Sequence, residues 1–137
     1  LEVRGEDGAA HVNGDATRLR AAFDAVFRAV LREKGGPCVV VAERRRETQN
    51  GKGAAVVVVS EAATVQAAYE RDRGVFDEKR GGMGLALPLA RRVIEGHGGR
   101  IAAPAPVPGP EAGATLDLLA ADPVARGSAI ITLPLTE

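Results

Sequence analysis

The segment from Gly81 to Ile101, GGMGLALPLARRVIEGHGGRI, decides how the fold of this chain is interpreted. Three glycines stand among its first four residues, a segment with helical spacing of apolar residues follows, and His97-Gly-Gly ends it. Glycine-rich turns that lead into a helix place backbone N–H groups and the positive end of the helix dipole where a phosphate can bind. The segment therefore raises the question of whether the rest of the chain supplies a nucleotide site.

The composition is that of a single soluble domain. The chain has 137 residues, of which 45% are apolar and 26% charged, and its 18 basic and 18 acidic residues give a net charge of zero. A balanced charge gives no indication of a nucleic-acid or membrane-surface partner. The single cysteine, Cys38, is expected to be a small buried apolar residue. No apolar run reaches the about 20 residues of a membrane-spanning helix. Because the chain starts without Met, we expect a fragment of a longer protein.

The clearest predicted helix follows Asp15. This residue can cap the N-terminus, and Gly35-Gly36 can end the helix. Apolar residues recur between these limits at steps of three and four, which predicts one apolar face: Leu19, Phe23, Val26, Phe27, Val30 and Leu31.

Strands are predicted on both sides of this helix. Short strands are expected at Leu1–Arg4 and Ala10–Asn13, and interior strands at Pro37–Glu43 and Ala54–Ser60, whose β-branched runs indicate burial on both faces. Asn50-Gly51 predicts that the two interior strands form a hairpin. The run of arginines at 44–46 has two interpretations, an anion-binding patch or a solvated strand end, and the second is favoured.

The second half of the chain predicts fewer regular elements. A short helix and then a mobile loop are expected over Glu61–Arg80, and a second long helix over Gly84–Gly96, with Pro88 tolerated in its first turn. Its expected apolar stripe is Leu85, Leu89, Val93 and Ile94. Strands are predicted at Ile101–Ala103 and Ser128–Leu135, the region at about 103–114 is a Pro/Ala-rich insert, and Thr115–Ala120 is ambiguous.

Three segments in this order resemble motifs of the catalytic, ATP-binding (HATPase_c, Bergerat-fold) domain of bacterial sensor histidine kinases. Asp15–Leu19 resembles the D-x-x-R-L start of the first helix. Gly81–Ile101 resembles the G-G-x-G-L-G-L box with its H-G-G-x-I end, and Gly127–Leu135 resembles the terminal G-T-x-F-x-F-x-L-P strand. The resemblance covers essentially the whole chain. It implies an α/β two-layer sandwich, in which a mixed, mostly antiparallel sheet is covered on one face by two long helices and a short third segment.

The resemblance also implies ATP and Mg²⁺ as cofactors, but the residues that would hold the cation are changed. The family's Mg²⁺-binding Asn falls on Ala29, and the other asparagine of the same box falls on Ala25. An alanine methyl group cannot coordinate a cation that requires oxygen ligands. Arg32 keeps the basic residue of the box. We therefore expect no metal site and only doubtful ATP binding.

The adenine-binding motif D-x-G-x-G is changed as well. Depending on the register, its Asp falls on Ser60 or on Glu61, and neither register retains the glycines. The phosphate-binding part is better kept, because Gly81, Gly82 and Gly84 can offer backbone N–H groups, and Lys79 lies where many members have a lid lysine. Together with Arg32, Ser60 and Glu61, these residues form the expected vestigial nucleotide site. Between retained anion binding and no ligand at the glycines, the residues give no preference.

No residue is predicted to be catalytic. His97 stands at a helix end, where the favoured interpretation is a partner of the helix dipole and the alternative is a catalytic base. His11 lacks the helical His-Glu context of a phosphoacceptor, and no Ser-His-Asp or Cys-His arrangement is recognisable.

Two functions from different classes follow from the resemblance. The favoured one is a degenerate ATPase-like domain of a two-component sensor kinase, with weak or no ATP binding and a regulatory or interaction role. The alternative is an active domain that transfers the γ-phosphoryl group of ATP to a histidine on an adjacent helical domain. The implied partners are that dimerisation and phosphoacceptor domain and a response regulator. The expected location is the cytoplasm, whether or not the parent protein is membrane-anchored.

Overall fold

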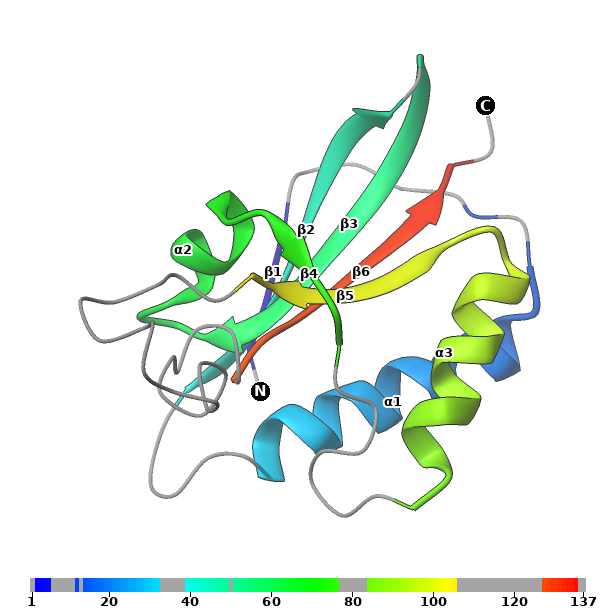
Figure 1. Ribbon diagram of the computed structural model, residues 1–137, viewed down its shortest axis with the longest axis horizontal. Helices are drawn as coiled ribbons and strands as arrows, with labels where there is room; N and C mark the ends of the chain where they lie inside the picture. Colours follow the sequence, from blue (N-terminus) through cyan, green and yellow to red (C-terminus); the bar gives the residue numbers. More distant parts are fainter. Residues whose placement is uncertain are drawn as a thin grey trace, which may run out of the picture.

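The computed structural model describes residues 2–5, 12, 14–32, 39–49, 51–76, 84–105 and 127–135. These residues form a six-stranded sheet with the order β1-β2-β3-β6-β5-β4. The long helices α1 (Ala16–Arg32) and α3 (Ala86–Gly96) cover one face of this sheet, and the short helix α2 (Val65–Glu70) lies on the other face (Figure 1). The α/β two-layer arrangement of a sheet and two long helices is as predicted.

The sheet is mixed and mostly antiparallel, also as predicted. Strand β1 (Glu2–Gly5) pairs in parallel with β2 (Val40–Gln49), and every other pair of neighbouring strands is antiparallel. The remaining strands are β3 (Lys52–Glu61), β4 (Arg73–Gly74), β5 (Arg100–Pro104) and β6 (Ala129–Pro134). Because β6, at the end of the described chain, lies between β3 and β5, the core forms only when both halves of the chain meet.

The predicted hairpin is present and is longer than expected. Strands β2 and β3 pair antiparallel along their full lengths, from Val40↔Glu61 to Gln49↔Lys52, and Gly51 in the turn has a φ of 78°. The arginines at 44–46 therefore lie within β2, in register with β3, and not at a solvated strand end. Charged residues extend this strand because some of them pack against helix α2, as described below.

Helix α1 has the predicted cap. The backbone N–H of Arg18 donates to Asp15 Oδ1 at 3.1 Å, which satisfies one of the first N–H groups of the helix. The buried residues of the helix recur at helical spacing: Ala22, Val26, Ala29 and Val30. Leu19, Phe23 and Phe27 of the predicted face pack against the same core while partly exposed. Leu31 is 43% exposed, so the predicted apolar face was wrong for this residue.

The apolar stripe of helix α3 differs from the prediction. Leu87, Ala90 and Ile94 are buried, whereas Leu85 and Leu89 are 75% and 56% exposed. Leu87, Ala90 and Ile94 follow the three- and four-residue steps of one helical face, and the sheet contacts that face. Leu85 and Leu89 fall beside it, so the expected stripe was wrong for these two leucines.

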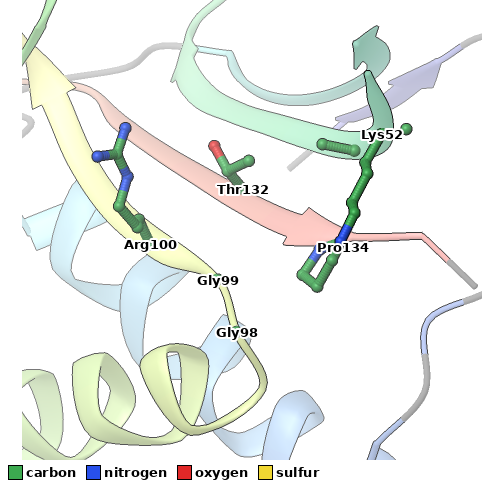
Figure 2. A pocket seen from close by; sticks show the side chains of 8 residues that line it. Lys52, Gly98, Gly99, Arg100, Thr132 and Pro134 are labelled. Carbon is green, nitrogen blue, oxygen red and sulfur yellow. The ribbon is translucent and has the colours of Figure 1, made fainter. Parts of the chain in front are cut away.

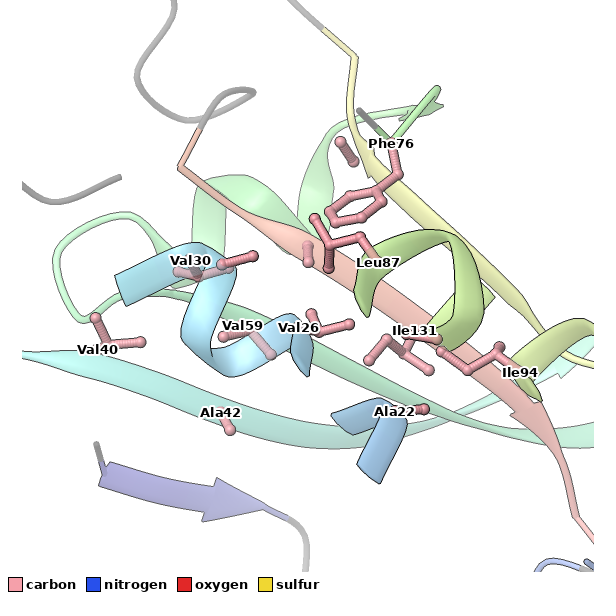
Figure 3. Close-up of a cluster of buried hydrophobic side chains, with 14 of the residues drawn as sticks. Ala22, Val26, Val30, Val40, Ala42, Val59, Phe76, Leu87, Ile94 and Ile131 are labelled. Carbon is pink, nitrogen blue, oxygen red and sulfur yellow. The ribbon is translucent and has the colours of Figure 1, made fainter. Parts of the chain in front are cut away.

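The principal core lies between the two long helices and the sheet (Figure 3). Val26 and Val30 of α1 and Ile94 of α3 meet Val59 and Ile131 of the two central strands, as part of one cluster of buried apolar residues. The core is aliphatic, as the low aromatic content of 3% predicts, and Phe76 lies beside Leu87 at its edge.

A second, smaller cluster lies on the opposite face of the sheet. Val65 and Ala68 of α2 pack on Val56 and Val58 of β3 and on Ile130 of β6. The short third segment was expected on the same face as the long helices, and that detail is corrected here. Strand β3 explains the position of α2. Its side chains point alternately to the two faces of the sheet and are apolar on both, so both faces must be covered.

The segment after β3 contains more structure than predicted. Helix α2 accounts for the expected short helix, and β4 pairs with β5 through Arg73↔Pro104 and Gly74↔Ala103 where a loop was expected. Several predictions concern residues outside the described part of the chain: burial of Cys38, the Pro/Ala-rich insert beyond residue 105, and Thr115–Ala120. Of the strand predicted at Ala10–Asn13 only Val12 is described, and it does not lie in a strand.

Candidate functional site

The alanine that occupies the expected metal-binding position is part of the core. Ala29 has no exposed surface and belongs to the cluster formed by α1, α3 and the sheet, and Ala25 packs against the same cluster while partly buried. Arg32, which ends α1, is exposed. The structure therefore gives Ala29 an apolar packing role and leaves a basic residue one turn further along the helix.

Ser60, one candidate for the adenine-binding position, belongs to a chain of three hydroxyl groups, two of which are buried. Its Oγ lies 2.7 Å from Ser128 Oγ and 2.7 Å from Thr64 Oγ1, and Ser60 and Ser128 are both fully buried. Thr64 Oγ1 donates to the carbonyl of Glu61 at 3.3 Å. Since each hydroxyl carries one proton, the chain then runs from Ser128 to Ser60 and on to Thr64. The Ser60 hydroxyl thus makes one hydrogen bond as acceptor and one as donor, both to side chains of the protein itself.

Ser60 and Glu61 face opposite sides of the sheet. Ser60 is in register with Val41, which belongs to the cluster under α2, and Glu61 is in register with Val40, which belongs to the cluster under α1 and α3. Residues directly opposite in a ladder share a face. Glu61 therefore lies on the side of Ala29 and Arg32, and Ser60 does not. The sequence allowed the family's Asp to align with either Ser60 or Glu61. Because side chains alternate along β3, only Glu61 lies on the face covered by α1.

The described part of the glycine box ends in a left-handed turn before α3. Gly84 has a φ of 61° and is exposed, and α3 begins two residues later at Ala86. Gly81, Gly82 and Lys79, the other predicted phosphate-binding residues, lie outside the described residues.

His97 connects the two long helices. Its Nδ1 lies 2.7 Å from the carbonyl of Val93, and its Nε2 accepts a hydrogen bond of 2.9 Å from the backbone N–H of Asp15. Because a carbonyl can only accept, the ring proton lies on Nδ1. The predicted role at the end of α3 is present, and the link to the start of α1 is additional. A histidine with both nitrogens used in this way is a structural residue.

A cluster around Tyr69 was not predicted. The Arg45 guanidinium lies 4.0 Å from the centre of the Tyr69 ring and 2.6 Å from the Glu43 carboxylate, and Arg73 lies 5.7 Å from the same ring and 3.0 Å from Glu47. Burial raises the pKa of Tyr69, and its hydrogen bond to Glu47 raises this pKa further. The alternation of charge in β2 was the available signal, since it leaves one arginine and two glutamates on the face that α2 covers.

The described residues contain no group of three or more His, Cys, Asp or Glu side chains that could hold a metal ion. None of the helices in the described ranges is both long and apolar enough to span a bilayer.

Comparisons with known proteins identify the family. The chain is 38% identical over 113 residues to the Sensor protein CutS of Streptomyces coelicolor, and equally to that of Streptomyces lividans. These matches cover 75% of this chain and 26% of each relative, so the chain corresponds to about a quarter of their length. The solved structure of a mycobacterial sensor histidine kinase, MprB, superposes with a TM-score of 0.53 at 22% identity, over 98% of this chain and 81% of that one.

The fold is that of a histidine kinase ATPase-like domain. Together with the sequence similarity, it shows that the chain is an ATPase-like domain of the sensor histidine kinase family. The resemblance inferred from the three motifs is confirmed. No family model matches the chain.

Proposed function

We propose that this domain is a degenerate member of its family, which binds ATP weakly or not at all and acts in two-component signal transduction through a regulatory or interaction role. Its partners in this proposal are an adjacent dimerisation and phosphoacceptor domain and a response regulator. A degenerate domain of this kind contributes a folded surface to the signalling protein and not a phosphoryl transfer step.

The burial of Ala29 carries the proposal. The resemblance assigns this position to the Asn that holds Mg²⁺, and here it is a methyl group without exposed surface, packed with Val26 and Val30. Mg²⁺ binds through oxygen ligands in near-octahedral geometry. Phosphoryl transfer depends on positioning and on neutralisation of the phosphate charge, so loss of the cation reduces turnover by several orders of magnitude.

The adenine end supports the same conclusion. The Ser60 hydroxyl is already hydrogen-bonded to Thr64 and to the buried Ser128, and no glycine stands at 62–65, where the family's backbone approaches the ring. A base held without its carboxylate partner and without close backbone contact loses both the orienting hydrogen bond and the packing that make the site specific.

One observation favours the alternative of an active domain. Glu61 lies on the face of α1 and carries a carboxylate that can accept a hydrogen bond from an amino group. If the glycine box contributes phosphate contacts, this carboxylate would give a shifted but functional nucleotide site.

A thermal unfolding experiment separates the two. A ligand present at 100 times its Kd stabilises the folded state by about 2.7 kcal/mol, which raises the Tm of a domain of this size by about 8 °C. We expect no shift with millimolar Mg-ATP. A shift of several degrees that needs both Mg²⁺ and the nucleotide, and that Glu61→Gln abolishes, would instead establish the active alternative.

A further inference from the structure

The sheet face that carries α2 also holds a pocket at its other end. The pocket has a volume of about 690 Å³ and is formed by the start of β3, the end of β6 and the segment that joins α3 to β5 (Figure 2). It lies on the opposite face of the sheet from Ala29 and Glu61 and at the other end of β3 from Ser60, so it is separate from the vestigial nucleotide site. The residues that line it are Lys52, Gly53, Ala54, Gly98, Gly99, Arg100, Thr132 and Pro134.

Strand register places the polar side chains of the pocket on one face of the sheet. Arg100 is directly opposite Thr132 in the β5–β6 pair, and Thr132 is opposite Val56 of β3. Lys52 precedes Val56 by four residues on the same strand, so its side chain falls on the same face. Figure 2 shows the Arg100 and Thr132 side chains rising from neighbouring strands on one side, with the Lys52 side chain extending toward Pro134.

The two glycines of the joining segment fix this arrangement. Gly98 has a φ of 81°, and a Cβ at Gly99 would collide with the carbonyl oxygen of Thr132 and lie 2.8 Å from Leu133 Cδ2. Only glycine lets the backbone approach β6 so closely. This approach places Arg100 at the first position of β5, beside Thr132, and the two glycines line the pocket.

In the described part of the chain, no acidic side chain neutralises the positive charges of this pocket. Among the residues that the structure describes, no hydrogen-bond or ion-pair partner is found for the Lys52 and Arg100 side chains, and no acidic residue lines the pocket. The other arginines on this face differ, because Arg45 is paired with Glu43 and Arg73 with Glu47. Glu47 is opposite Ala54 in the ladder, but its carboxylate is already used by Arg73.

We propose that this pocket binds a small anion of the phosphate class, either free or as the phosphoryl group of a small molecule or lipid headgroup. The Arg100 guanidinium supplies a planar fork that matches phosphate oxygens, Lys52 supplies a second positive charge, and the Thr132 hydroxyl supplies a neutral donor. A volume of about 690 Å³ exceeds a bare phosphate and lies within the range of small-molecule pockets. A phosphorylated small molecule therefore fits the volume and the charge together.

An NMR titration tests this proposal. Inorganic phosphate and glucose 6-phosphate are added separately to the ¹⁵N-labelled chain at constant ionic strength, with chloride as the reference anion. We expect saturable shifts of the Gly98, Gly99 and Thr132 amides with either phosphate compound and not with chloride. Arg100→Gln and Lys52→Gln should each weaken binding by about tenfold, which corresponds to the loss of one charge-assisted hydrogen bond.

Arg20→Gln is the matched control, because Arg20 is exposed on α1 in the other layer and its loss changes the net charge equally. All three substitutions are at exposed positions, and an unchanged Tm verifies the fold of each. Sedimentation with phosphatidylcholine vesicles, with and without phosphatidic acid, identifies a headgroup as the source if only the anionic vesicles bind and Arg100→Gln releases them. Equal shifts with chloride, equal weakening by Arg20→Gln, or no saturable shift and no vesicle binding would overturn the proposal.

Discussion

The backbone N–H of Asp15 donates a hydrogen bond of 2.9 Å to His97 Nε2, across 82 residues of sequence. This bond joins the N-terminal cap of α1 to the C-terminal end of α3, whose Val93 carbonyl accepts from the other ring nitrogen. A single neutral imidazole thus satisfies one group at each of two helix ends. The relative position of the two helices that enclose Ala29 therefore depends on His97.

Replacing His97 should loosen this connection. His97→Ala leaves the Asp15 N–H and the Val93 carbonyl without their partner, which should lower the free energy of unfolding by about 1 to 3 kcal/mol. Urea unfolding followed by circular dichroism measures this change. Glu95→Ala, at an exposed position of the same helix, is the control. A loss for His97→Ala no larger than that for Glu95→Ala would contradict the structural role.

Gly14 should tolerate a side chain only when His97 is absent. A Cβ at Gly14 would overlap the His97 ring, because even the Cγ atom of that ring would lie only 3.3 Å away. We expect Gly14→Ala to destabilise the protein by about 1 to 3 kcal/mol, as other overpacking substitutions do. In the His97→Ala background this cost should largely disappear, which a double-mutant cycle detects as a coupling energy. Strictly additive effects would show that the two residues are not in contact.

Tyr69 should ionise at higher pH than a free tyrosine. Burial raises its pKa, and the hydrogen bond to Glu47 adds to the effect. A raised pKa means that the folded state holds the proton more tightly. The resulting stability is present below the unfolded pKa of about 10 and is lost as the pH rises through the folded value.

The Tyr69 titration can be followed directly, because the chain has one tyrosine and no tryptophan. Tyrosinate absorbs at longer wavelength than neutral tyrosine. Its ultraviolet absorbance, followed as a function of pH, therefore gives the ionisation midpoint of this residue alone. Glu47→Gln should lower the midpoint, since it removes a carboxylate that opposes ionisation. A midpoint at or below that of the unfolded chain would contradict the described surroundings of the ring.

The hydroxyl chain predicts an order of destabilisation. Ser60→Ala removes the middle member and with it both hydroxyl–hydroxyl contacts of the chain, whereas Ser128→Ala removes only one of them. Each unsatisfied buried hydroxyl costs about 1 to 3 kcal/mol. We therefore expect Ser60→Ala to reduce the free energy of unfolding more than Ser128→Ala does, as measured by urea unfolding. The reverse order would exclude this chain of hydrogen bonds.

Ala29→Asn examines the expected metal position. If Ala29 is enclosed by apolar residues, an Asn there must bury an amide in the core and enlarge the side chain, which costs about 2 to 4 kcal/mol in total. Urea unfolding should show this loss, and Mg²⁺ should not reduce it. Ala21→Asn, at an exposed position of the same helix, controls for helix propensity. Stabilisation of Ala29→Asn by Mg-ATP would mean that a cation-binding cavity persists.

The fold followed from local signals, and most of the differences arose from contacts between distant segments. The Asp15 cap and the apolar spacing after it involve only residues of one helix and its start, so the position of α1 was predicted closely. The extension of β2 was not, because Arg45 and Glu47 resemble solvent-facing residues until Tyr69, more than 20 residues later, packs beside them. Similarly, helical spacing alone did not show that the sheet contacts Leu87 and not Leu85.

The sequence predicted which motif residues of the family are replaced in the candidate site, but it did not predict how the replacing side chains are arranged. The motifs identified Ala29 and the two registers at Ser60 and Glu61 from the sequence. Which register faces α1 depends on the phase of β3 and on its pairing with β2, and the engagement of Ser60 depends on Ser128, 68 residues away. Such long-range hydroxyl pairs leave no periodic signal in a sequence.

We infer that the apolar core around Ala29 occupies the position at which the family's domain holds the nucleotide-bound cation. Isothermal titration of the chain with a non-hydrolysable ATP analogue, with Mg²⁺ and again with EDTA, tests it most directly. The account predicts no saturable heat in either series up to millimolar analogue. One-to-one binding with a micromolar Kd that disappears in EDTA would contradict it.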